Sequence, residues 1–123
     1  MLKKLKTLKD KRGSLVVYEK NHFRIKRVFV ITGKKNASRG NHAHKNTIQL
    51  LININSKSRL SLTNKTTKTI NFSKEGEYVL CPKKTWLKID FIKEGSIMVL
   101  CDKKYDKKDY INNIENFKKL HLK

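Results

Sequence analysis

The chain has 123 residues, of which 30 are lysine or arginine and 10 are aspartate or glutamate, giving a net charge of +20 at pH 7. This length suits a single domain, residues 1–123, and is short for two. No continuous apolar stretch is long enough for a signal peptide or a membrane span. We therefore expect a cytoplasmic protein with no membrane partner.

The positive charge raises the question of a nucleic acid partner, because clustered basic side chains neutralise phosphates. However, the basic residues are nearly all lysines, scattered through every segment, and arginine occurs at five positions only. Arginine is the residue that suits bidentate contacts with phosphates and bases. We therefore predict no nucleic acid partner, and a surface field that attracts a small phosphorylated substrate instead.

Short apolar or alternating runs between turn signals predict about eight β-strands, as in an all-β sandwich or barrel. Besides a strand that carries two histidines, the predicted ranges are 15–19, 25–31, 48–54, 59–63, 66–72, 77–81, 86–92 and 96–101. A turn is expected at Asn64-Lys65. In the strand 25–31, Arg27 shares a face with Phe29 and Ile31, which is unusual for a plain core.

The last part of the chain changes character. Tyr110, Ile114 and Phe117 recur at helical spacing behind Asp106, a residue type that caps helices. The spacing predicts a C-terminal α-helix over residues 106–120, with its apolar stripe packed against the outside of a sheet.

His42 and His44 are two of only four histidines in the chain. Two residues apart in a strand, they project from the same side of it. Such a pair can bind a metal ion, transfer protons, or be no more than two solvated residues. The spacing alone leaves all three interpretations open.

A metal site is the weakest of these interpretations. Small β-barrels with an inward His-x-His are familiar as cupins, whose metal-binding form adds a glutamate and a third histidine. Here Gln49 stands at the glutamate position, and the segment 82–87 supplies no histidine. An amide is a poor ligand for a divalent transition ion, and two imidazoles alone rarely hold zinc or iron. We therefore predict no metal and turn to acid/base chemistry.

Five ordered blocks between residues 10 and 117 resemble the sugar nucleotide 3,4-ketoisomerases. They are Asp10-Lys11-Arg12-Gly13-Ser14-Leu15, Lys26-Arg27-Val28-Phe29, Arg39-Gly40-Asn41-His42-Ala43-His44-Lys45, Gln49, and Tyr105-Asp106-Lys107-Lys108-Asp109-Tyr110-Ile111. The resemblance implies a cupin-type jelly roll with a C-terminal helix, a homodimer with exchanged N-terminal strands, and dTDP-4-keto-6-deoxyglucose as substrate. It also implies a 3-keto product, which a PLP-dependent aminotransferase next converts to a 3-amino-3,6-dideoxyhexose for surface glycans.

The residues can perform this chemistry without a cofactor. A ketone at C4 acidifies the hydrogen at C3, so a neutral imidazole can remove that proton, form an enediol and return a proton to C4. His42 and His44 can divide the roles of base and acid if one ring is neutral and the other protonated. The sequence does not tell which ring takes which role.

Five further residues are candidates for substrate binding. Arg39 and Gln49 are candidate donors to the enediolate, although strand parity places Gln49 opposite His44 unless the chain bends near Asn46-Thr47. Arg27 can pair with the pyrophosphate. Trp86 and Tyr105 either contact the substrate or pack in the fold, Trp86 in the core and Tyr105 against the helix.

The chain departs from the family at two places. Members often carry a tyrosine where this chain has Phe29 or Val30, and a His or Arg followed by Glu where it has Leu87-Lys88. The configuration at C4 of the product, galacto or gluco, therefore stays open. The alternatives to an isomerase are an epimerase on the same fold and a non-catalytic basic binding module.

Overall fold

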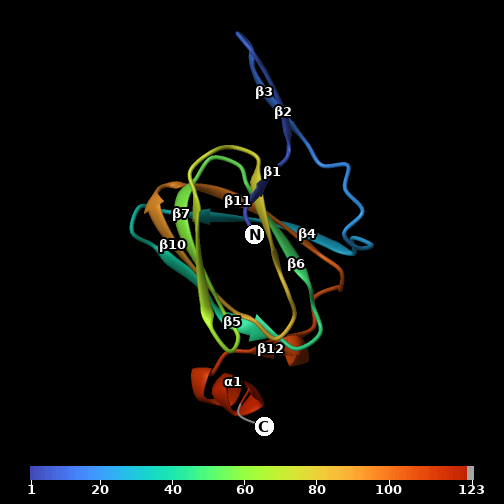
Figure 1. The fold of residues 1–123 in the computed structure, drawn as a ribbon, viewed down its shortest axis with the longest axis vertical. Coiled ribbons are helices and arrows are strands. Elements are labelled where there is room, and N and C mark those ends of the chain that lie inside the picture. Colours follow the sequence, from blue (N-terminus) through green and yellow to red (C-terminus); the bar gives the residue numbers. More distant parts are fainter. Residues whose placement is uncertain (122–123) are drawn as a thin grey trace.

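The computed structural model describes residues 1–121, which form two facing antiparallel sheets (Figure 1). The first sheet has the order β1 (Lys3–Lys4), β9 (Glu77–Cys81), β6 (Gln49–Asn53), β11 (Gly95–Cys101), β4 (Arg27–Gly33). The second has the order β12 (Tyr110–Ile111), β5 (Ser38–His44), β10 (Trp86–Lys93), β7 (Lys57–Thr63), β8 (Thr67–Phe72). The predicted all-β, cupin-type fold is confirmed.

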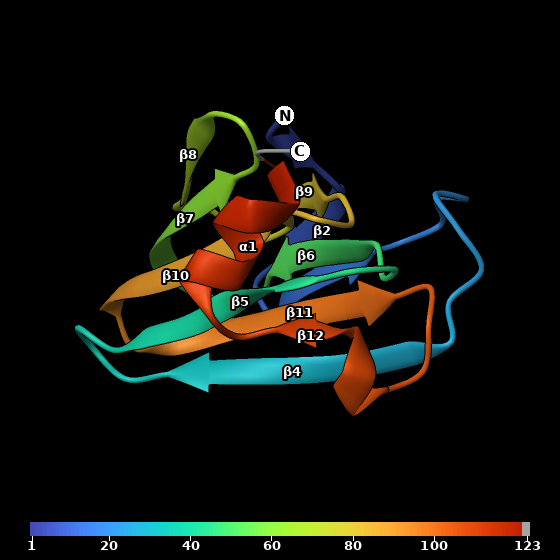
Figure 2. The ribbon, with the colours of Figure 1, turned by 90° about the horizontal axis from the view of Figure 1, so that it is seen from below.

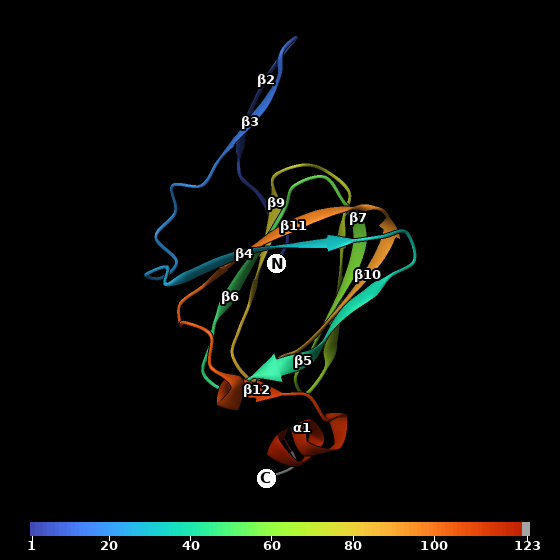
Figure 3. The same ribbon diagram turned by 180° about the vertical axis from the view of Figure 1, so that it is seen from behind.

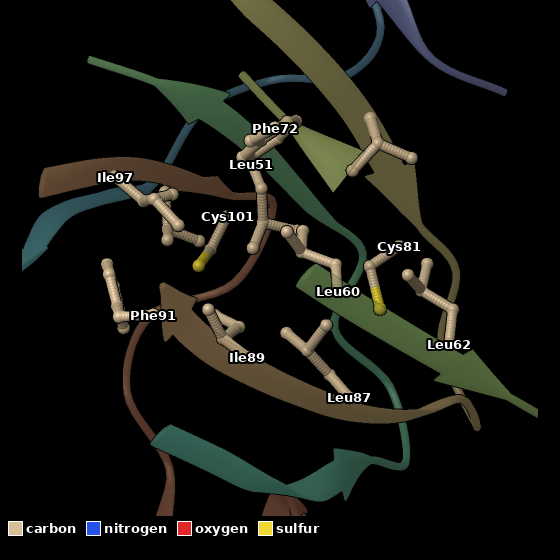
Figure 4. Packing of buried hydrophobic residues seen from close by; sticks show 12 residues of the cluster. Leu51, Leu60, Leu62, Phe72, Cys81, Leu87, Ile89, Phe91, Ile97 and Cys101 are labelled. Atoms are coloured by element: carbon tan, nitrogen blue, oxygen red, sulfur yellow. The ribbon is translucent and has the colours of Figure 1, made fainter. Parts of the chain in front are cut away.

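The core lies between the two sheets, where the inward faces of alternating strands meet (Figure 4). Leu87, Ile89 and Phe91 point inward from β10, and Leu51 and Ile97 face them from the other sheet. Each such buried side chain contributes roughly 1.5–3 kcal/mol relative to an exposed one. The alternation in the sequence therefore fixes which face of each strand becomes the interior.

The outer face of the first sheet is partly covered by the N-terminal part of the chain. Leu50, Ile52 and Leu100 point away from the core, and Leu5 and Tyr18 pack against this outer cluster. This is why every residue of β6 is buried, on both faces of its sheet. A strand buried on both sides reads as an apolar run without alternation, and residues 48–54 fit this pattern except at Gln49 and Asn53.

The third sheet is a hairpin of β2 (Lys6–Asp10) and β3 (Gly13–Val17). It projects from one end of the sandwich, at the opposite end from the C-terminal helix (Figures 1 and 3). Strands β1 and β2 were not expected from the sequence, because lysine-rich segments lack the alternation that predicts a strand. Their pairing is with β9 and β3, so tertiary contacts decide their conformation.

The predicted turn at Asn64-Lys65 is confirmed. The Asn64 side-chain oxygen accepts hydrogen bonds from the backbone N–H groups of Lys65 and Thr66, at 2.6 and 3.4 Å. The two flanking strands meet in register, with Thr63 opposite Thr67. This turn joins β7 to β8, which is the edge strand of the second sheet.

The helix predicted over residues 106–120 is wrong in its first half. The structure has a 3₁₀ turn at Lys107–Asp109, the short strand β12, and then α1 (Ile114–His121). Asp106 does act as an N-cap, but of the 3₁₀ turn, where its side chain accepts from the N–H of Lys108. Tyr110 pairs with His44 across β12 and β5, and this long-range pairing overrides the helical spacing.

The helix α1 itself lies beside β12 and β5, at the end of the sandwich (Figure 2). Phe117 is buried against Ala43 and Ile111 and so fixes the helix to the second sheet. No helix within residues 1–121 is long and apolar enough to cross a membrane.

Candidate active site

An irregularity in β5 brings Arg39 and His42 to the same side of the strand. The register between β5 and β10 shifts here, since Leu87 lies opposite His42 but Lys88 lies opposite Gly40. Gly40 and Asn41 both have positive φ, +85° and +58°. A Cβ on Gly40 would lie 2.8 Å from the carbonyl oxygen of Leu87, so the bulge requires glycine there.

His42 and His44 lie side by side, as their spacing predicts. Their ring centroids are 5.1 Å apart and the rings are nearly perpendicular. His42 is half-buried, and its Nδ1 lies 3.2 Å from the carbonyl oxygen of Gly40. Because a carbonyl only accepts, Nδ1 carries the proton and Nε2 of the neutral ring keeps its lone pair. Burial, followed by the proximity of His44, lowers the pKa of His42 below its usual 6.5, which favours this neutral form.

Asp109 holds the second imidazole. Its Oδ2 lies 2.7 Å from His44 Nδ1 and 2.5 Å from the hydroxyl of Thr47, while Oδ1 accepts from the N–H of Asn46 at 2.7 Å. Burial alone would raise the pKa of Asp109, but the hydrogen bonds from Thr47, His44 and Asn46 outweigh it and lower that pKa. The carboxylate is therefore ionised, and its bond to Nδ1 fixes the orientation of the His44 ring.

The second ring nitrogen of His44 is buried and has no partner among the described residues. His44 is only 5% exposed, and its Nε2 is buried without a hydrogen bond to any of the described residues. A buried polar atom left unpaired costs about 1–3 kcal/mol. Such atoms are rare in folded proteins and point to a functional role.

Tyr110 packs against both imidazoles. Its ring centroid lies 4.3 Å from that of His44 and 5.1 Å from that of His42. Its hydroxyl oxygen accepts a hydrogen bond from Nη1 of Arg27 at 3.1 Å. The Arg27 guanidinium also lies over the rings of Phe29, at 4.5 Å, and Tyr105, at 5.2 Å. These contacts fix a positive charge beside the imidazoles.

Gln49 faces the same cavity as His42, because the chain bends between β5 and β6. The bend at Lys45 and Asn46 breaks the strand parity that would have placed the amide on the opposite side. Gln49 is buried, and its Nε2 makes a long contact of 3.8 Å to the sulfur of Cys101. Burial raises the pKa of the Cys101 thiol, so the sulfur stays neutral beside the amide.

The cavity between the sheets has a volume of about 260 Å³. Its polar lining consists of Arg27, Arg39, His42, Gln49 and Tyr110, and its apolar lining includes Phe29, Leu87, Ile89 and Val99. The site thus combines a neutral imidazole, two guanidiniums, an amide and a phenol. Such a set can remove a proton from a carbon atom and stabilise the resulting negative charge.

The predicted site residues fall into three groups. Arg27, Arg39, His42 and Gln49 line the cavity. His44 lies behind it, and the exposed Tyr105 stands at its rim beside Arg27. Trp86 does not line the cavity; it packs 5.6 Å from Phe117 of α1, so a substrate role for Trp86 stays a prediction.

Asp109 and Tyr110 were not among the predicted site residues. Both lie in a sequence block that the family resemblance singles out, but the helical spacing of Tyr110, Ile114 and Phe117 assigned them to a helix. A signal was present, since an acidic residue directly precedes an aromatic one after the last long strand. Its meaning depends on the pairing of β12 with β5, which no local pattern predicts.

The arrangement of possible metal ligands can be examined in the described part of the chain. Within residues 1–121, no three histidine, cysteine, aspartate or glutamate side chains gather closely enough to hold a metal ion. Near the two histidines, the Asp109 carboxylate is already engaged by three hydrogen bonds.

Comparison with known families identifies the chain. Residues 1–121 match the family described as FdtA: WxcM-like, C-terminal. The chain belongs to this family. No curated protein sequence matches it.

Several solved structures similar to this FdtA-family chain are 3,4-ketoisomerases. One, from Helicobacter canadensis, has a TM-score of 0.89 and 26% identity and covers 100% of this chain and 97% of its own. QdtA from Thermoanaerobacterium thermosaccharolyticum, in complex with TDP, has a TM-score of 0.88 and 30% identity, with coverage of 99% and 93%. WlaRB, the TDP-quinovose 3,4-ketoisomerase of Campylobacter jejuni, has a TM-score of 0.84 and 32% identity, with coverage of 95% of both chains. A histidine-to-asparagine variant of QdtA has also been solved with TDP-4-keto-6-deoxyglucose. The predicted resemblance is confirmed.

Proposed function

We propose that this chain is an isomerase that moves the keto group of dTDP-4-keto-6-deoxyglucose from C4 to C3. The observation that carries the proposal is His42, a cavity-lining imidazole whose Nδ1 is engaged by a backbone carbonyl and whose Nε2 is free to accept a proton. The similarity to 3,4-ketoisomerases over nearly the whole chain supports the same reaction.

The two imidazoles are proposed to take different roles. Neutral His42 removes the proton from C3 and returns it to C4, because its lowered pKa keeps it unprotonated near neutrality. The ionised Asp109 holds His44 in place through Nδ1, at 2.7 Å. The proximity of His44 adds to the burial that lowers the pKa of His42, so His44 supports the neutral form of the base.

The remaining cavity residues are proposed to bind the substrate. Arg39 and Gln49 donate to the enediolate oxygens as negative charge develops there. Arg27 keeps N–H groups beyond the one given to Tyr110, and these can pair with the pyrophosphate. The cavity, about 260 Å³, suits the sugar, so the nucleotide extends over its rim, where Tyr105 is exposed. Trp86 would contact the substrate from its position beside Phe117 of α1.

We also propose a homodimer with exchanged N-terminal strands. The β2–β3 hairpin stands away from the sandwich (Figure 1), and its cross-strand pair Leu8 and Leu15 is 50% and 59% exposed. An isolated two-stranded hairpin is marginally stable in water, so a second copy is the expected support. Sedimentation velocity tests this proposal: a dimer whose sedimentation coefficient falls to the monomer value in Leu8→Asp, but not in Ile92→Asp, supports it.

We place the enzyme in the cytoplasm, with no nucleic acid or membrane partner and no cofactor. Its 3-keto product would pass to a PLP-dependent aminotransferase that makes a 3-amino-3,6-dideoxyhexose. No cofactor is needed for the proposed reaction, because a proton shift alone relocates the carbonyl group.

One experiment tests the function. The purified protein is incubated with dTDP-4-keto-6-deoxyglucose in deuterated water, and the sugar is followed by NMR. A 3-keto sugar, or its capture by an aminotransferase, is the expected product. Deuterium at C3 or C5 with the ketone still at C4 would identify an epimerase instead. Binding with neither a 3-keto product nor any exchange would identify a non-catalytic module.

A further inference from the structure

The proposed reaction moves two protons, and the histidines account for only one of them. In the substrate C4 carries the carbonyl and C3 a hydroxyl, whereas in the product C3 carries the carbonyl and C4 a hydroxyl. One proton therefore moves between carbon atoms, which is the step given to His42. A second proton must move from the oxygen on C3 to the oxygen on C4.

His44 is badly placed for this second transfer. Its Nδ1 is bound to Asp109 at 2.7 Å, and its Nε2 is buried and does not line the cavity. Proton transfer needs a heavy-atom distance within hydrogen-bond reach of the substrate. His42 and Tyr110, whose rings pack against His44, line the cavity, whereas His44 does not.

Among the described residues that line the cavity, few can give and take back a proton. Arg27 and Arg39 keep their protons at any working pH, and the Gln49 amide does not titrate usefully. His42 is engaged with the carbon atoms. The phenol of Tyr110 is the remaining group with an exchangeable proton, and it lines the same cavity.

We propose that Tyr110 is a catalytic residue, whose hydroxyl carries the proton between the C3 and C4 oxygens of the sugar. This inference rests on the proposed isomerase function. As His42 takes the C3 proton, the C3–H electron pair forms the C3=C4 bond, and the C4 oxygen takes the phenol proton. The phenolate then removes the proton of the C3 hydroxyl while the C3=O bond forms and His42 returns its proton to C4. Both residues end in their starting states.

The contact with Arg27 prepares the phenol for this role. Arg27 donates to the hydroxyl oxygen at 3.1 Å, so the phenol hydrogen is left to point elsewhere. Within residues 1–121, this is the one hydrogen bond that the Tyr110 hydroxyl group makes. The guanidinium charge stabilises the phenolate formed during the transfer. Packing against two imidazoles, with centroids 4.3 and 5.1 Å away, fixes the direction of the ring.

The test is Tyr110→Phe, which removes the hydroxyl and keeps the ring. We expect kcat to fall by about 10²–10⁴-fold, the usual contribution of a general acid or base, with KM and TDP affinity within threefold of wild type. Tyr18→Phe is the matched control, because it removes a phenol hydroxyl that bonds to His22 away from the cavity. Its kcat should not change.

The pH profile separates a proton-transfer role from a structural one. The wild-type rate should fall at alkaline pH, where the phenol ionises, and Tyr110→Phe should lack this fall. A fluorinated tyrosine inserted at position 110 should move it to lower pH, which keeps the test usable if Tyr110→Phe folds poorly. A kcat within threefold of wild type in Tyr110→Phe, or an alkaline limb that the fluorinated residue leaves in place, would overturn the assignment. Absence of 3-keto product from the wild-type protein would refute the proposed function itself.

Discussion

Two buried polar clusters lie at opposite ends of β6, and they differ in whether their hydrogen bonds are complete. At one end Asn53 donates to the carbonyl oxygens of Ser56 and Lys74, at 2.9 and 3.0 Å. Its side-chain oxygen accepts from the N–H and the hydroxyl of Ser56, at 2.9 and 2.6 Å. Every polar atom of this side chain has a partner, so the cluster can only hold the loop in place.

The cluster at the Gln49 end is left open. His44 Nε2 is the one buried side-chain nitrogen or oxygen without a partner in residues 1–121. The phenol hydrogen of Tyr110 is uncommitted, and His42 keeps a lone pair toward the cavity. A closed polar cluster stabilises a fold, whereas an open one retains groups that can act on a substrate.

The largest effect is expected from the imidazoles of the open cluster. His42→Asn removes the base that faces the cavity, and His44→Asn removes the ring that Asp109 holds beside that base. Each should lower kcat by about 10³-fold or more while the protein stays folded. Product formation followed by NMR, together with a thermal melt, measures both properties. Substantial activity in both variants would refute the proton-transfer roles.

A reciprocal exchange compares the two clusters directly. Asp109→Asn replaces the ionised carboxylate by a neutral amide and should lower kcat by roughly 10²-fold or more, because the His44 ring loses its charge partner. Asn53→Asp puts a carboxylate oxygen against two carbonyls of the closed cluster. It should cost about 2–4 kcal/mol of unfolding free energy in a urea titration and leave kcat of the folded protein unchanged. A catalytic loss from Asn53→Asp, or none from Asp109→Asn, would abolish the distinction.

The two clusters also show how far a sequence predicts a structure. Strand alternation correctly put Arg27, Phe29 and Ile31 on one face and His42 beside His44, because a period of two is a local property. Gln49 faces the cavity because the chain bends between β5 and β6, and the sequence pattern is compatible with this bend but does not predict it. Tyr110 was misassigned because a helical period of three to four residues and a strand pairing to His44 predict opposite structures. At Tyr110, a residue of the candidate site, the local sequence pattern and the long-range strand pairing therefore conflict.

The pH dependence gives a smaller and graded effect. His42 must be neutral to act as a base, and its pKa is lowered below 6.5, first by burial and then by His44. kcat/KM should therefore stay constant from neutrality down past pH 6.5, and then fall about tenfold per pH unit as the ring takes up a proton. The fall lies on the acid side because protonation, not deprotonation, removes the base. A fall that begins above pH 6.5 would show that His42 is not held neutral.

Treatment with a chelator is expected to have no effect on the rate of isomerisation. The open cluster offers two imidazoles but no third histidine, and Gln49 replaces the carboxylate that a divalent transition ion would prefer. The Asp109 carboxylate is bound by His44, Thr47 and the N–H of Asn46, so binding a metal would require it to give up these contacts. Dialysis against EDTA should leave the rate of isomerisation unchanged, with a known metal-dependent enzyme treated in parallel as the positive control. If EDTA abolished the activity and added zinc or iron restored it, the unpaired nitrogens of the two histidines would be metal ligands rather than proton-transfer groups.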